Sequence, residues 1–149
     1  MTLSFFVEPI TLTDALRQTV LHEPGTLFLD STGSRTQSDR PTFSFIAFQP
    51  FLSITVNKGR ITTQARTGEI IHRDESPLLF FDQLIQQYSF SQTIPESPIW
   101  GGLFGSFSYE FSRYMDDYKH LHKAALFPDF IGGLYDRLIV MNHQNNETF

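Results

Sequence analysis

The five histidines are the side chains of this sequence best suited to hold a metal, and only two of them are close together. His120 and His122 form an H-x-H pair on a charged stretch, with no third ligand nearby. Zinc sites use three or four protein ligands, and the sequence contains no cysteine to supply a thiolate. We therefore predict no metal site in this chain.

A glycine-rich segment and a few polar residues are the other candidates for chemistry. The glycines between Gly101 and Gly105 lack the spacing of a dinucleotide fingerprint and the Lys-Ser/Thr of a phosphate-binding loop. Ser106 lacks the second flanking glycine of a nucleophile elbow. The acidic pairs at 74–75 and 116–117 lie in polar stretches typical of solvated surface. The residues alone predict no catalytic set, and we interpret the glycines as sites of close backbone packing.

Two helices and a series of short strands are the elements that would position any site. Thr11 or Thr13 would cap a helix over about 12–22, and Pro77 opens a second helix that ends near Ser89. We expect residues 43–72 to form one antiparallel meander and 110–114 a helical turn. Segments rich in branched and aromatic residues between Pro/Gly turns predict strands at 26–29, 43–48, 51–56, 60–63, 69–72, 101–109 and 134–141.

The composition fits one α+β domain over residues 1–149, with a mainly antiparallel sheet and two or three packed helices. The 16 phenylalanines supply bulk for its core. The net charge of −5 opposes binding to nucleic acid or anionic lipid, and no apolar stretch approaches the roughly 20 residues of a membrane span. The absence of cysteine and of a signal peptide fits the cytoplasm. We expect a cytoplasmic protein that binds neither nucleic acid nor membrane.

Three stretches resemble the signatures of one enzyme family, in order and in spacing. Residues 97–110 (SPIWGGLFGSFSYE) resemble P-F-x-G-G-x-x-G-x-x-x-Y-D/E. Residues 127–136 (FPDFIGGLYD), with Asn142-His143 after them, resemble L-P-D-x-x-x-G-x-Y-D followed by D-H. Residues 27–31 (LFLDS), with 43–50 downstream, resemble the L-L-x-S strand and the next strand, which ends in Pro. The chain is thus similar to the N-terminal domain of the chorismate-utilising enzymes over essentially its whole length.

This resemblance implies an enzyme that transfers an amino group onto chorismate, with ammonia from a glutamine amidotransferase partner. Two branches of the family fit: component I of aminodeoxychorismate synthase, in folate synthesis, and component I of anthranilate synthase, in tryptophan synthesis. Residues 75–78 and 133–136, together with Asp30, look closest to the first.

The family's members are much longer than this chain. Their chorismate site, Mg²⁺ carboxylates and catalytic residues lie in a C-terminal part that is absent here, so we expect the present chain to be catalytically inert and to hold no cofactor. The alternative is a standalone ligand-binding domain of the same fold, without catalytic function.

The resemblance also implies a tryptophan site at the end of one strand. In the family, the Ser of L-L-x-S and the residues just ahead of the next strand contact bound tryptophan. Ser31 would bond the amino-acid head, Asp30 its ammonium, and Phe43 would face the indole. Two positions depart from the family pattern: Thr42 stands where Arg is common, and Asn142 where Asp usually precedes His. Carried onto this sequence, the wall consists of Asp30, Ser31, Arg40, Pro41, Thr42 and Phe43.

Overall fold

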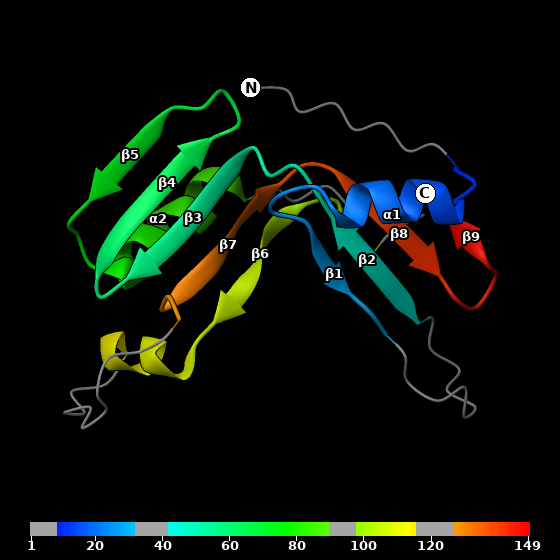
Figure 1. Ribbon diagram of the computed structural model, residues 1–149. Helices are drawn as coiled ribbons and strands as arrows, with labels where there is room; N and C mark the ends of the chain where they lie inside the picture. The colour runs from blue at the N-terminus through cyan, green and yellow to red at the C-terminus, as the bar shows by residue number, and fades with distance from the viewer. Residues whose placement is uncertain (1–8, 32–41, 90–97, 116–126) are drawn as a thin grey trace.

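The structure, a computed structural model, describes residues 9–31, 42–89, 98–115 and 127–149. The helices of this described part are α1 (Asp14–Leu21), α2 (Pro77–Tyr88) and the 3₁₀ helix η1 (Tyr109–Tyr114) (Figure 1). Every element predicted up to residue 109 has a counterpart here. The strands are β1 (Leu27–Leu29), β2 (Phe43–Ala47), β3 (Leu52–Asn57), β4 (Arg60–Ala65), β5 (Ile70–Arg73), β6 (Gly102–Phe107), β7 (Phe130–Tyr135), β8 (Leu138–Asn142) and β9 (Glu147–Thr148).

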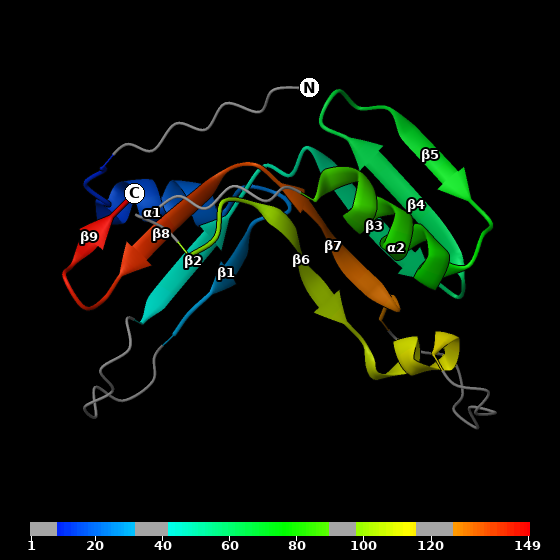
Figure 2. The same ribbon diagram turned by 180° about the vertical axis from the view of Figure 1, so that it is seen from behind.

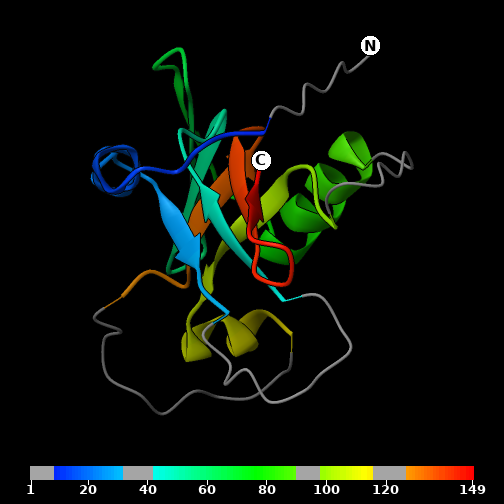
Figure 3. The ribbon, with the colours of Figure 1, turned by 90° about the vertical axis from the view of Figure 1, so that its right-hand side faces the viewer.

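The strands form two antiparallel sheets. The four-stranded sheet has the order β1-β2-β8-β9, and the five-stranded sheet has the order β5-β4-β3-β7-β6. Helix α1 packs on the first sheet and α2 on the second, and the two helices lie on opposite sides of the molecule (Figure 2). The view from the side shows the same separation (Figure 3). The prediction of an α+β fold with mainly antiparallel strand pairing is confirmed, but the strands form two sheets where one was expected.

Two long chain segments run through both sheets and bend at a shared corner. Strand β2 pairs with β8 as far as Ala47–Leu138, and β3 pairs with β7 from Leu52–Leu134. Four residues (48–51) connect these positions on one segment and three (135–137) on the other. The extra residue makes a β-bulge, which is how strands commonly change from one sheet to another. Gln49 at this bulge has a φ of 48°.

Two predictions are wrong at this corner. The meander expected over 43–72 contains only β3, β4 and β5, because β2 pairs with β8 in the other sheet. The single strand expected over 134–141 is divided between β7 and β8. Arg66 holds the corner by donating from Nε to the Gln49 carbonyl oxygen at 3.1 Å and by pairing with Asp136. Gln49-Pro50 is a local turn signal, and such a signal does not distinguish a hairpin from a strand that changes sheets.

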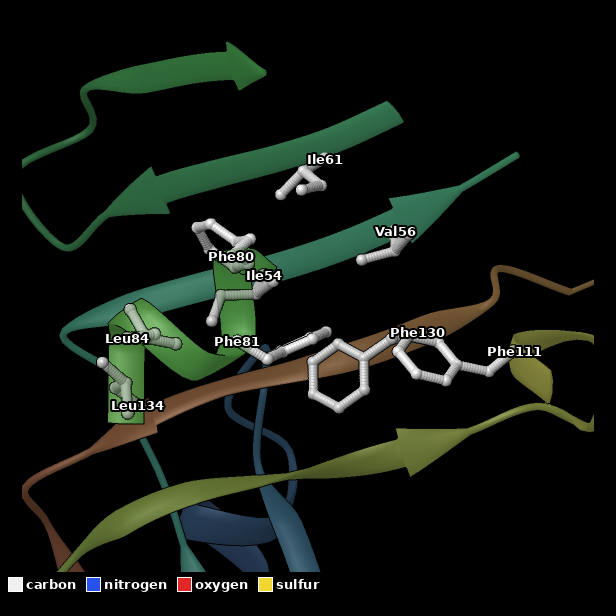
Figure 4. Close-up of a cluster of buried hydrophobic side chains, with 9 residues drawn as sticks. All are labelled: Ile54, Val56, Ile61, Phe80, Phe81, Leu84, Phe111, Phe130 and Leu134. Carbon is white, nitrogen blue, oxygen red and sulfur yellow. The ribbon is translucent and has the colours of Figure 1, made fainter. Parts of the chain in front are cut away.

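The larger core lies between α2 and the five-stranded sheet and is rich in aromatic rings (Figure 4). Its buried members are Ile54, Val56, Ile61, Phe80, Phe81, Leu84, Phe111, Phe130 and Leu134. The ring centroids of Phe81 and Phe130 lie 4.8 Å apart in a T-shaped arrangement, which adds about 0.5–1.5 kcal/mol beyond the area that the rings bury. The phenylalanine content therefore builds a core, as the sequence predicts.

Helix α1 rests on a smaller core, in which Val20 packs with Ile46 and Ile139. Of the two threonines predicted to cap it, Thr13 is the cap, since its Oγ1 accepts the N–H of Leu16 at 3.2 Å. Nowhere in the described ranges is a helix long and apolar enough to cross a membrane.

Gly105 in β6 and Gly101 just before this strand permit close backbone packing, as predicted. A Cβ on Gly105 would lie 2.5 Å from Cζ of Phe130, and one on Gly101 would lie 2.5 Å from the carbonyl oxygen of Tyr135. Gly102 has open space around it but a φ of +132°, which L side chains rarely adopt. The glycine-rich segment is therefore a packing element of the sheet.

Candidate ligand site at the end of strand β1

Four of the six predicted ligand residues lie together at one end of the four-stranded sheet. Asp30 and Ser31 follow β1 directly, while Thr42 precedes β2 and Phe43 begins it. The β1–β2 register, continued by two residues, sets Asp30 opposite Ser44 and Ser31 opposite Phe43. The remaining two predicted residues, Arg40 and Pro41, lie outside the described residues. The structure thus brings the two quoted segments side by side, and their role in binding tryptophan stays a prediction.

The four residues are divided between two faces of the sheet. The Asp30 carboxylate reaches Ser44, which is fully buried on the face that α1 covers. Phe43 and Phe45 alternate with Ser44 along β2, so they point to the opposite face, where their rings stack with centroids 6.1 Å apart. One ligand can contact both Asp30 and Phe43 only by reaching around the strand end.

A polar network that the sequence does not predict lies behind this strand end. Ser44 Oγ lies 2.8 Å from Oδ1 of Asp30 and 2.7 Å from Nε2 of His143, and it accepts the N–H of Ser31 at 3.0 Å. The backbone N–H of His143 also donates to the Thr42 carbonyl oxygen at 2.9 Å. The signal in the sequence was a serine at a core-facing position of the apolar strand FSFIA.

This network has the residue types of a hydrolase triad but not its geometry. In a triad, His stands between Ser and Asp, and the Ser oxygen is accessible to substrate. Here Ser44 stands between Asp30 and His143, and it is 0% exposed. The arrangement can fix the positions of strands, but it cannot supply a nucleophile.

A second polar cluster centres on Asp129, which is the aspartate of the stretch FPDF (residues 127–130) in the second signature. Asp129 is 1% exposed. Its carboxylate accepts the Lys58 N–H at 2.7 Å and the Tyr114 hydroxyl at 2.6 Å, and it pairs with Arg113 at 3.2 Å. Burial, followed by the hydrogen bond to Asp129, raises the pKa of Tyr114 to about 12. These bonds tie η1 to the β3–β4 turn, so the cluster is structural.

The end of the same signature is also used to hold the fold together. Tyr135 is buried and donates its hydroxyl to the Gly25 carbonyl oxygen at 2.7 Å, and burial raises its pKa. Asp136 pairs with Arg66 at the corner between the sheets. The described residues of the signature therefore account for strand packing and corner geometry, and they provide no reaction centre.

Metal ligands do not gather in the part of the chain that the structure describes. Within those residues, no group of three His, Asp or Glu side chains could hold a metal ion. His120 and His122 fall between residues 116 and 126, outside the described ranges.

The comparisons with known proteins give a match at the level of the fold. No family model and no curated protein matches the chain. Among solved structures, the chain is similar to the crystal structure of anthranilate synthase component I from Streptococcus pneumoniae, with a TM-score of 0.55 and 22% sequence identity. The match covers 92% of this chain and 28% of that one. The chain therefore has the fold of a segment of that protein and spans little more than a quarter of its length.

Proposed function

We propose that this chain is the N-terminal domain of a chorismate-utilising enzyme of the component I type. The observation that carries the proposal is the structural match over 92% of the chain to an anthranilate synthase component I. The three sequence signatures support it independently, since they occur in the family's order and are spread along most of the chain. The chain matches only 28% of the solved structure. This supports assigning the chorismate site, Mg²⁺ and the contact with the amidotransferase to the full-length enzyme and not to this domain alone.

Within the family we favour component I of aminodeoxychorismate synthase, which aminates chorismate to 4-amino-4-deoxychorismate. Asp30 supports this branch, because it stands where the anthranilate enzymes typically carry Glu. The segments 75–78 and 133–136 support it as well. Component I of anthranilate synthase is the alternative, and the solved structure that the chain resembles belongs to that branch. Ammonia would come from a glutamine amidotransferase in either case.

We assign the strand end at Asp30–Ser31 and Thr42–Phe43, with Arg40 and Pro41, to one wall of a tryptophan site. The adjacency of the two segments supports this assignment. The wall belongs to a larger pocket that the rest of the enzyme completes. The isolated chain should therefore bind tryptophan weakly, because it buries only part of the ligand.

The decisive test is the reaction of the whole gene product. We expect the reading frame to continue well past Phe149 and the full-length protein to consume chorismate with ammonia or with glutamine and its amidotransferase. Formation of 4-amino-4-deoxychorismate would support the favoured branch, and formation of anthranilate would support the alternative. A stop codon directly after Phe149 would instead favour a standalone ligand-binding domain.

The matched control is the 149-residue chain itself. It should leave chorismate unchanged, because the described residues contain no catalytic set. Turnover by the purified chain above a buffer blank would overturn the assignment of catalysis to residues outside this chain.

A further inference from the structure

The Ser44 hydroxyl has three partners in the structure, and this number matches its bonding capacity. A serine hydroxyl has one hydrogen to donate and two lone pairs that accept. Ser44 Oγ lies within hydrogen-bond distance of Asp30 Oδ1, Ser31 N and His143 Nε2. Because Ser44 is 0% exposed, these protein groups take the place of solvent around its oxygen.

The direction of each hydrogen bond follows from the chemistry of the three partners. A carboxylate only accepts, so the Ser44 hydrogen goes to Oδ1 of Asp30. The Ser31 N–H only donates, and it takes one lone pair of Ser44 Oγ. The remaining lone pair requires a donor, so His143 must carry a hydrogen on Nε2. The network thus defines the tautomer of His143.

These bonds join three chain segments that are distant in sequence. They link the end of β1 to β2 and to the turn after β8, and the His143 N–H adds a bond to the Thr42 carbonyl oxygen. The segments they join carry Asp30–Ser31 and Thr42–Phe43, which belong to the wall of the candidate site. Ser44 lies behind this wall and is too buried to contact a ligand itself.

We infer that Ser44 and His143 are positioning residues, which fix the Asp30–Ser31 strand end in the conformation that receives the ligand. This inference rests on the proposed tryptophan site for its functional consequence. The hydrogen-bond network itself can be measured without any ligand. The two parts can therefore fail separately.

The network is tested first by amide hydrogen exchange and NMR on the ligand-free chain. In Ser44→Ala, the Ser31 amide should exchange about tenfold faster, since it loses its acceptor. The His143 amide should keep its protection, because its acceptor is the Thr42 carbonyl oxygen. Nitrogen chemical shifts of neutral His143 should show hydrogen on Nε2. Unchanged exchange at Ser31, or hydrogen on Nδ1 alone, would overturn the network.

Two variants control this measurement. Ser53→Ala removes a hydroxyl from β3 in the other sheet and should leave Ser31 exchange unchanged. Ser44→Cys keeps the shape of the side chain and replaces the hydroxyl by a larger, weakly hydrogen-bonding S–H group, so it should accelerate exchange less than Ser44→Ala does. Equal acceleration in all three variants would show a general loosening of the fold and would overturn the inference.

The functional part is tested by titrating L-tryptophan into the same proteins by NMR. Ser44→Ala and His143→Ala should weaken binding about fivefold or more, while His143→Gln, whose amide can replace the Nε2–H donor, should restore most of the affinity. Equal affinity in all variants would overturn the positioning role. Absence of binding to the unmodified chain would overturn the tryptophan assignment and this role with it, while the exchange data still decide the network.

Discussion

The two sheets of this chain are stabilised in different ways. The core cluster between α2 and the five-stranded sheet contains nine buried apolar residues, one of them from η1, whereas the cluster between α1 and the four-stranded sheet contains three. The larger sheet is also supported by the buried carboxylate of Asp129, directly before β7, while the smaller one depends on the neutral Ser44 with exposed partners in Asp30 and His143. The comparison shows that the sheet with the thinner core uses directional bonds to fix its strand ends, and those ends form the candidate ligand site.

The largest effect should come from the packing of the five-stranded sheet. A Cβ on Gly132 would lie 2.2 Å from the Phe104 carbonyl oxygen, which would force β6 and β7 apart. We expect Gly132→Ala to lower the free energy of unfolding by about 4 kcal/mol, measured by urea denaturation with Trp100 fluorescence. The matched control is Gly102→Ala, which meets only the strain of a positive φ and should cost about 1–2 kcal/mol. Equal losses would refute this account of the packing.

The next effect should come from the buried charge of the same sheet. Asp129→Ala removes the acceptor of Lys58 N–H, Tyr114 and Arg113 together, and we expect a loss of about 3 kcal/mol in the free energy of unfolding. The control is Asp136→Ala, which removes a carboxylate that is 49% exposed and paired with Arg66. It should cost below about 1 kcal/mol. If Asp129→Ala also lowered the free energy of unfolding by less than about 1 kcal/mol, the buried carboxylate would stabilise the fold no more than a surface ion pair does.

The burial of Tyr114 and its hydrogen bond to Asp129 should also be visible as a pH dependence of stability. The pKa of Tyr114 is raised in the folded state from 10.0 to about 12. Its contribution to stability is therefore fully present below pH 10 and is lost as the pH rises toward 12. Urea denaturation at several pH values in this window should show a shallower decline for Tyr114→Phe than for the unmodified chain. Tyr135 is common to both proteins, so identical declines would contradict the role of Tyr114.

The smallest change in global stability should come from the four-stranded sheet. Ser44→Ala removes a buried hydroxyl, but water can reach the exposed Asp30 and His143 and replace the lost bonds. We expect a loss of about 1 kcal/mol in urea denaturation. A loss as large as that of Asp129→Ala would mean that both sheets depend equally on their polar centres, and the contrast between them would no longer hold.

The sequence predicts the elements of this fold better than it predicts their pairing. Pro77 correctly marks the start of α2, and the Phe-rich segments correctly indicate the core. Gln49-Pro50 predicts a turn within one sheet, because the partner that makes this bend a corner lies in the distant segment 135–137.

The candidate site is predictable only in part, because some of its contacts join residues that are distant in the sequence. The neighbouring segments at Asp30–Ser31 and Thr42–Phe43 follow from the family resemblance. The role of Ser44 does not, because its partners Asp30 and His143 are 14 and 99 residues away in the sequence. Alternation along β2 shows only that Ser44 faces inward, and tertiary contacts decide what it meets there.

The bulge at the corner also sets the phase of side-chain alternation. Even-numbered residues face the core in both β2 and β3, but on the partner segment the core residues change from Phe130 and Leu134 to the odd-numbered Ile139. The extra residue within 48–51 shifts the alternation of that segment by one position. Residues paired across the two segments therefore still face the same core after the corner, where the buried face changes from the α1 side to the α2 side. Deleting one residue there would turn Phe43 toward α1 and Ser44 away from it, whereas deleting two would preserve the phase.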